Sequence, residues 1–252
     1  MRIRTTRGDG MAGQMEQRFS GFTPATFDFL QNLAVNNNKA WFEAHRAEYE
    51  QYLLAPMKAL VGELAGPLLA IDPELVTAPG RAISRIYRDT RFSRDKSPYK
   101  TTTWMTFKRP LKEWQDAPCF FFELVPDSYR FGMGFYSAAK ENMDRLRERI
   151  ERRPAEFQKA IAFYARQDRF VLEGERYKRP LKADLPDSLQ QWHQRKNLYL
   201  VCNRQPDGSL FTRRLADDLR QGFTLLAPFY DYLWQVRARP LSIRTATREN
   251  SP

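Results

Sequence analysis

The sequence predicts an α+β fold, in which an antiparallel sheet of about 4–6 strands packs with N-terminal and C-terminal helices. Apolar residues recur at helical spacing in the first third of the chain and again near its end. The middle consists instead of short apolar runs separated by turn residues. The connections between these runs suit hairpins and are too short for helices that cross between parallel strands. With 252 residues, 42% of them hydrophobic, the chain can build one substantial core.

One α+β domain is expected over residues 19–236, because no linker or internal repeat divides this range. Residues 1–18 are basic and lack the apolar segment of a secretory signal. Residues 237–252 are basic as well. We expect both ends to be disordered, the first as an N-terminal extension and the second as a C-terminal tail.

Three helices are expected in the first third of the chain. Thr23 is a suitable N-cap and Pro24 a suitable first residue for a helix that ends at residues 36–38, an Asn triplet. A second helix follows the triplet, and Pro56 opens a third. Turn residues within 72–80 end this helical part.

The rest of the chain alternates between strand and helix patterns. Short runs rich in β-branched and aromatic residues predict strands over 82–92, 101–108, 118–125 and 129–136. Helical spacing predicts helices over 138–152, 154–167, 187–196 and about 209–236. Two further strands are expected, a short one near 169–172 and one over 197–203 that joins the sheet.

The positive charge of the chain is concentrated in residues 81–100. The whole chain has a net charge of +11, to which residues 1–18 contribute +2 and residues 237–252 contribute +3. Residues 81–100 hold seven cationic side chains and two carboxylates, so they contribute +5. Apolar residues such as Ile83 and Ile86 are interspersed in this segment, which indicates that it is held in a fixed shape. The pattern predicts a binding site for something negatively charged.

If residues 83–92 form a strand, alternate side chains lie on opposite faces, with Arg85 and Arg91 on one face and Arg88 on the other. Guanidinium groups on a rigid strand suit bidentate contacts with phosphate or carboxylate. The following loop adds hydroxyl and ammonium groups. The predicted ligand-binding residues are Arg85, Arg88, Arg91, Ser93, Lys96, Lys100 and Tyr136.

Gly132 and Gly134 share one face of their predicted strand, together with Tyr136. Two missing side chains leave a trough that a helix, another strand or a ligand can enter. Close packing of a helix is the favoured explanation. With the basic segment, the trough gives a second indication of a site on one face of the sheet.

Several kinds of site are not indicated. The sequence has no phosphate-binding P-loop, no nucleophile elbow and no zinc motif, and its only histidines are His45 and His193. We therefore expect no metal ion and no cofactor, and no catalytic residue is assigned. Cys119 and Cys202 lie in apolar runs, as expected of core thiols in a reducing cytoplasm. We find no apolar stretch of membrane-spanning length, so a cytoplasmic protein without membrane contact is expected.

Five segments carry a resemblance to a known family. They lie at residues 19–30, 36–37, 41–49, 85–100 and 132–136. The longest reads Arg-Ile-Tyr-Arg-Asp-Thr-Arg-Phe-Ser-Arg-Asp-Lys-Ser-Pro-Tyr-Lys and is the most specific. In these segments the chain resembles a bacterial and fungal family of uncharacterised proteins of the DUF2461 type. The resemblance implies a single cytosolic domain and supplies no activity.

Three functional hypotheses follow from the basic segment. The first is a pocket for a phosphate- or carboxylate-bearing small molecule, and the sequence leaves open whether that pocket is also catalytic. The second is a basic face that tracks nucleic acid, with aromatic residues such as Phe92 and Trp104 as stacking surfaces. The third is an interaction domain in which the arginines form structural ion pairs with Asp89, Asp95 and Glu123.

Overall fold

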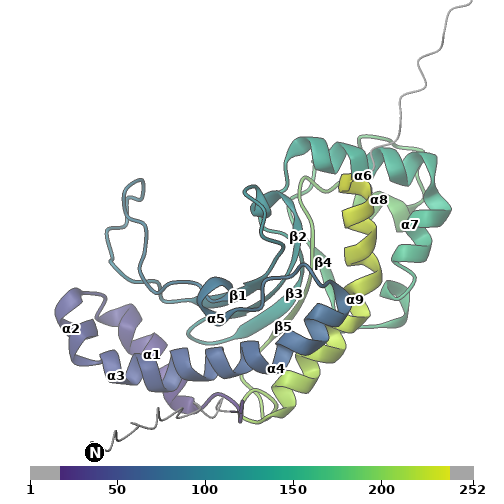
Figure 1. Cartoon of the computed structure of the whole chain (residues 1–252). Coiled ribbons are helices and arrows are strands. Elements are labelled where there is room, and N and C mark those ends of the chain that lie inside the picture. The colour runs from purple at the N-terminus through teal and green to yellow at the C-terminus, as the bar shows by residue number, and fades with distance from the viewer. Residues whose placement is uncertain (1–17, 239–252) are drawn as a thin grey trace, which may run out of the picture.

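The computed structural model describes residues 18–238, and Figure 1 shows how their helices and strands are arranged. The extension expected over 1–18 and the tail expected over 237–252 lie almost entirely outside these described residues. Within them the chain has the predicted α+β fold, with helices at both ends of an antiparallel sheet.

The sheet has five strands, each antiparallel to its neighbours, in the order β1-β2-β3-β5-β4. The strands are β1 (Thr103–Phe107), β2 (Pro118–Leu124), β3 (Tyr129–Phe135), β4 (Val171–Glu173) and β5 (Tyr199–Arg204). Residues 108–117 join β1 to β2 and residues 125–128 join β2 to β3, and both pairs of strands are antiparallel, as predicted. β5 pairs with β3 and places the short β4 at the edge, so the late strands join the sheet as predicted.

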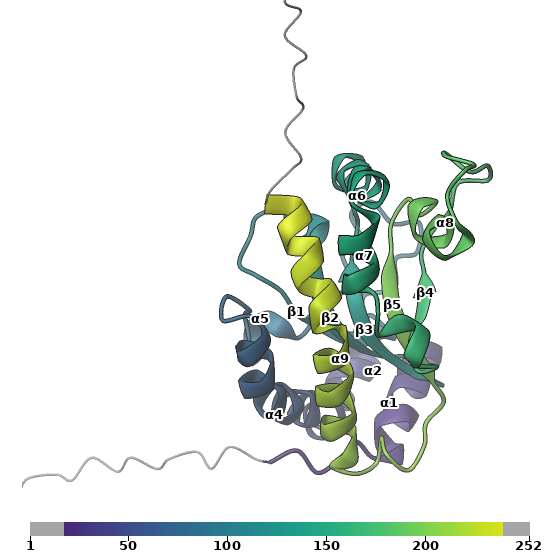
Figure 2. The same cartoon turned by 90° about the vertical axis from the view of Figure 1, so that its right-hand side faces the viewer.

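Nine α-helices lie within residues 18–238, and α4 and α9 pack against one face of the sheet. The nine helices are α1 (Pro24–Val35), α2 (Lys39–Ala44), α3 (Arg46–Glu48), α4 (Ala55–Ile71), α5 (Pro79–Ala82), α6 (Lys140–Arg152), α7 (Pro154–Ala160), α8 (Asp187–His193) and α9 (Arg214–Ala238). A π-helix (Tyr49–Leu54) links α3 to α4, and 3-10 turns lie at Trp114–Asp116 and Tyr164–Arg166. In Figure 2, α9 crosses in front of the sheet, and α6, α7 and α8 gather near its upper end.

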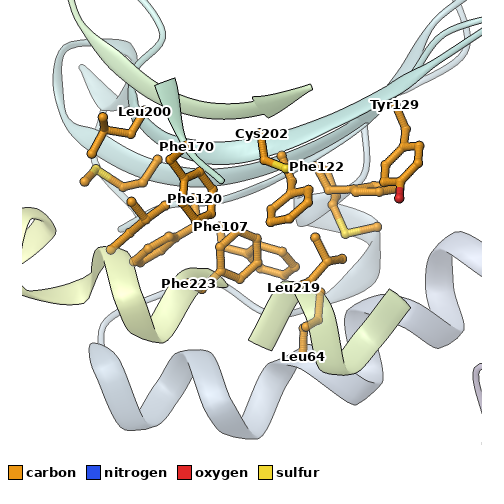
Figure 3. Close-up of a cluster of buried hydrophobic side chains, with 14 of the residues drawn as sticks. Leu64, Phe107, Phe120, Phe122, Tyr129, Phe170, Leu200, Cys202, Leu219 and Phe223 are labelled. Carbon is orange, nitrogen blue, oxygen red and sulfur yellow. The ribbon is translucent and has the colours of Figure 1, made fainter. Parts of the chain in front are cut away.

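The core lies between the sheet and the helices α4 and α9. Figure 3 shows Phe107, Phe120 and Phe122 pointing from the strands toward Phe223 on α9, with Leu64 of α4 below. These five side chains are almost fully buried. Because side chains alternate along a strand, the residues between them point to the opposite face of the sheet. That opposite face is turned away from α4 and α9, and it carries the candidate site.

A buried polar cluster ties the end of α4 to α9. Asp72, only 3% exposed, accepts a hydrogen bond from Arg109 Nε at 2.7 Å and another from the hydroxyl of Tyr230. The neighbouring Glu74 forms an ion pair with Arg109 at 2.7 Å. A buried carboxylate needs such partners, because an unpaired charge in the core is costly. The cluster therefore fixes the segment after β1 against the helices.

The strand predicted over 82–92 is wrong. Residues 83–102 form a loop between α5 and β1, the arginine-rich loop, which stands out from the sheet as the blue segment at the left of Figure 1. Only single bridge pairs form in it, Ile83 with Met105 and Tyr87 with Tyr99. Its arginines recur about every third residue. Because side chains alternate along a strand, this spacing would place charged side chains on both faces and leave neither face apolar. Extended pairing therefore stops after Tyr87.

β5 occupies the space beside the two glycines of β3. A Cβ on Gly132 would lie 1.9 Å from the carbonyl oxygen of Leu200, and one on Gly134 would lie 2.3 Å from the Cβ of Tyr199. The glycines thus allow the close approach of a neighbouring strand, β5. The favoured prediction, that a helix packs there, is wrong. The close approach also brings Tyr199 to the open face beside Gly134.

One helical run, Arg46–Ile71, is long and apolar enough by composition to span a membrane, which the sequence analysis did not anticipate. In this fold the run includes α4, whose stripe of Met57, Leu60 and Leu64 is buried. α4 packs along α9, as core helices of soluble proteins do.

Candidate functional site

Two contiguous cavities lie on the open face of the sheet. The sheet-face cavity has a volume of about 320 Å³ and lies over β1, β2, β3 and β5. The basic cavity has a volume of about 490 Å³ and lies between the strands and the arginine-rich loop. Trp104, Thr106 and Tyr136 line both cavities, so the two adjoin, and together they are called the depression below.

Strand alternation explains which residues line this depression. Met105 and Phe107 of β1 point into the core, so Trp104 and Thr106 point to the open face. The register of the sheet then places Glu123 opposite Trp104. The open face is therefore built from the polar and aromatic positions that the core does not use.

Four cations of the basic cavity have no carboxylate partner. They are Arg81, Arg85, Lys100 and Lys108, and none of them forms an ion pair within residues 18–238. The fifth cation of the cavity, Arg88, is paired with Asp95. Most arginines elsewhere in the described chain face an acid, so this group of four stands apart in its excess of positive charge.

Burial and mutual repulsion act on the two lysines. Burial lowers the pKa of Lys100 below the ordinary lysine value of 10.5, and the charge of Arg85 lowers it further. Burial also lowers the pKa of Lys108, and Arg81 acts in the same direction. A bound anion would oppose both effects, because it favours the charged form of each lysine.

Aromatic rings support the same two lysines. The ammonium of Lys100 lies 4.5 Å from the ring centroid of Trp104, and that of Lys108 lies 3.2 Å from the ring centroid of Trp114. Such cation–π contacts orient an ammonium without neutralising its charge. The lysines thus stay available to an anion in the cavity.

The base of the arginine-rich loop is held in place by hydrogen bonds. Lys100 N–H donates to the carbonyl of Ile86 at 2.8 Å, and Arg88 N–H donates to that of Pro98 at 2.9 Å. The side chain of Asn37 bonds both backbone groups of Tyr99, at 2.9 and 3.0 Å. These contacts fix the part of the loop that carries Arg85 and Lys100.

Aromatic packing adds to this support. The rings of Phe42 and Tyr99 stack with their centroids 4.1 Å apart, and Tyr87 lies against both. Phe42 and Asn37 come from the N-terminal segments of the family resemblance. Those segments therefore contact the arginine-rich loop and help to shape the site.

The predicted ligand-binding residues divide into two groups. Arg85, Arg88, Lys100 and Tyr136 line the basic cavity as one set. The others, Arg91, Ser93 and Lys96, lie toward the tip of the loop and line neither cavity.

Local contacts account for Arg91 and Lys96 at the loop tip. Arg91 forms an ion pair with Asp89 at 2.8 Å, and this pair lowers the pKa of Asp89 to about 2. Lys96 donates to the carbonyl of Thr90 at 2.9 Å. The hypothesis of structural ion pairs therefore describes Arg91 and Arg88, whereas Arg85 forms no ion pair with any residue from 18 to 238.

Several lining residues were missed from the sequence. Lys108, Trp114 and Gln115 come from the segment between β1 and β2 and reach the cavity only because that segment folds beside β1. Arg81 was counted in the basic segment but not assigned to the site. The parity of Trp104 in β1 is the one signal that could have placed a residue on this face.

The remaining thiols and imidazoles have structural partners. Cys119 is free and buried, and burial raises its pKa to about 12, so this thiol is unreactive. His45 Nδ1 lies 2.8 Å from the carbonyl of Trp41, and His193 Nε2 lies 2.8 Å from Glu151 Oε1. Among the described residues no group of three His, Cys, Asp or Glu side chains is arranged to hold a metal ion.

Comparison with known proteins places the chain in a family. No curated protein gives a significant match to this sequence. A family profile described as "Conserved hypothetical protein (DUF2461)" matches residues 25–232, which include both cavities and the arginine-rich loop. The match covers well over half of the chain, so this protein belongs to the DUF2461 family.

Proposed function

We propose that the protein binds a phosphate- or carboxylate-bearing small molecule in the basic cavity. The observation that carries this proposal is the group of four cations, Arg81, Arg85, Lys100 and Lys108, which face a common space without a carboxylate partner in the described chain. Like charges gathered in this way repel one another, and a bound anion relieves that repulsion.

The size and shape of the depression support a small ligand. Cavities that hold small molecules usually measure about 300–1,000 Å³ and combine apolar walls with a few polar groups. The basic cavity measures about 490 Å³, and Trp104 and Trp114 form part of its wall. Arg85 supplies a planar fork for bidentate contacts, and the lysines supply point charges.

Sulfate is the simplest probe for this proposal, because its charge is constant above neutral pH. We expect millimolar sulfate to stabilise the full chain against heat more than chloride does at equal ionic strength. With a dissociation constant of about 1 mM, 10 mM sulfate adds about 1.4 kcal/mol. In a domain of this size that raises Tm by roughly 3–6 °C. Equal effects of sulfate and chloride would contradict the proposal.

The same measurement has a predicted pH dependence. Sulfate binds the charged lysines, so its effect is fully present below the pKa values of Lys100 and Lys108 in the free protein. The effect decreases as pH rises through those values, which lie below 10.5. The difference in Tm with and without sulfate should therefore be smaller at pH 9.5 than at pH 7.5. An anion held by arginine alone would show no such decrease.

Nucleic acid is the second candidate partner, favoured by the aromatic residues outside the cavity. Phe92 at the loop tip is 94% exposed and lies among Arg91 and Arg94, and Tyr136 at the cavity rim is 61% exposed. Exposed rings beside cations are typical of surfaces that bind single strands. A single-stranded oligonucleotide that stabilises the protein more than sulfate, with an effect that falls steeply with salt, would support this candidate instead.

A further inference from the structure

The sheet-face cavity gives the proposed ligand a second part. It adjoins the basic cavity along Trp104, Thr106 and Tyr136, which line both, so a molecule anchored by the cations has the sheet-face cavity directly beside it. Its volume of about 320 Å³ matches the lower end of small-ligand sites. The anion is therefore expected to carry a further group toward the centre of the sheet.

The residues that line the sheet-face cavity suit a flat group. Thr106, Cys119 and Gly134 are small and leave depth at the sheet surface, while Phe121 of β2 and Tyr199 of β5 present large rings from the two sides of β3. Neither ring packs against another aromatic ring within residues 18–238. Two aromatic faces on an open cavity, without aromatic partners of their own, favour a planar ring as the occupant.

Polar groups at one end of the cavity define the ring further. Glu123 and Arg130 face each other across β2 and β3 and form an ion pair. Side by side they offer a hydrogen-bond acceptor and several donors. A hydrocarbon ring could form no hydrogen bond with the carboxylate of Glu123 or the guanidinium of Arg130. A heteroaromatic ring could, through its ring nitrogens and its exocyclic oxygen or amino groups.

We infer that the ligand is a phosphorylated heteroaromatic compound, of which a nucleoside monophosphate is the simplest representative. Its phosphate lies among Arg85, Lys100 and Lys108, and its ring lies in the sheet-face cavity beside Phe121 and the Glu123–Arg130 pair. The inference rests on the proposed function, because the same cations anchor the ligand in both. The inference specifies the chemical class of the ligand and assigns the open face of the sheet to the binding of its ring.

Calorimetric titration of the full chain separates the two parts of the ligand. The probes are AMP, which has phosphate and ring, and ribose 5-phosphate, which has the phosphate without the ring. We expect AMP to bind about tenfold more tightly than ribose 5-phosphate, which is the gain expected from stacking one base on an aromatic side chain. Ribose 5-phosphate should itself bind measurably, because the cations recognise its phosphate.

A matched pair of variants locates the ring. Phe121→Leu removes an aromatic face from the cavity and should bring the affinity for AMP down to that for ribose 5-phosphate. Phe92→Leu is the control, since Phe92 lies at the loop tip and lines neither cavity. It should keep the full advantage of AMP. Circular dichroism tests whether each variant is folded. If a variant does not fold, the affinities of the unaltered chain for AMP and ribose 5-phosphate decide whether the ligand carries a ring.

The outcomes distinguish the inference from the function on which it rests. Equal affinities for AMP and ribose 5-phosphate would overturn the ring inference and leave the anion site intact. Loss of the AMP advantage in Phe92→Leu but not in Phe121→Leu would also overturn it, by placing the ring at the loop tip. Absence of binding by any phosphate compound would overturn the proposed function and the inference together.

Discussion

The double variant Arg85→Ala/Lys100→Met should lose about 100-fold in affinity for sulfate. Both side chains line the basic cavity, and neither has a carboxylate partner among the described residues. A hydrogen bond to a charged group contributes about 1.5 kcal/mol or more, so the loss of two such bonds amounts to about 3 kcal/mol. Sulfate titration followed by calorimetry or by thermal unfolding measures this change.

The matched control is Arg94→Ala/Lys96→Met in the same loop. It removes the same charges, and Lys96, like Lys100, donates its ammonium to a backbone carbonyl of the loop. In the described structure neither Arg94 nor Lys96 lines the basic cavity, so this variant should keep the sulfate response. If the control loses as much affinity as the test variant, the anion is held at the loop tip. The original assignment of Lys96 from the sequence would then be the correct one.

Gly132→Ala should destabilise the fold by about 3 kcal/mol, the upper range for an overpacked core. The added Cβ would lie 1.9 Å from the carbonyl oxygen of Leu200, a backbone atom of β5. That atom cannot retreat without breaking the ladder between β3 and β5, which includes the pair Gly132–Val201. The expected fall in Tm is roughly 6–12 °C for a domain of this size.

The same substitution at Gly62 provides the control. Gly62 lies in the interior of α4, and a Cβ there would meet no atom within 4 Å. Gly62→Ala should stabilise the protein by about 0.5–1 kcal/mol, because alanine is the better helix former. A Gly132→Ala protein as stable as the unaltered chain would show that β5 does not approach β3 as closely as described here.

The fold could be predicted where local pattern and burial agree. In β2 the sequence Cys119-Phe-Phe-Phe-Glu has no clean alternation, yet its aromatic content predicts a strand over 118–125, and the sheet contains β2 there, paired with β1 and β3. The same reasoning gave a wrong prediction for the arginine-rich loop, where a strand was expected over 82–92. Its short apolar pairs, such as Ile86 and Tyr87, resemble a strand locally, but no neighbouring strand runs beside residues 88–97 to pair with their backbone.

The sequence predicted the positive charge of the candidate site but not which residues would line its cavity. The net charge of residues 81–100 predicted Arg85 and Lys100 as ligand-binding residues, since charge is additive along the sequence, and both line the basic cavity. Ion pairing is a tertiary property, so the sequence could not tell the paired Arg88 from the unpaired Arg85. Lys108 could not be found at all, because it reaches the cavity through the fold of a different segment.

A crystal structure grown with millimolar sulfate tests most directly whether the basic cavity binds an anion. We expect a tetrahedral anion within about 2.7–3.2 Å of the side-chain nitrogens of Arg85 and Lys100, inside the basic cavity. A cavity without an anion, in which Arg85 turns to form an ion pair with Asp89, would overturn the proposed anion site. The basic segment would then be a structural feature of the loop, and the function of the protein would have to be sought elsewhere on the sheet.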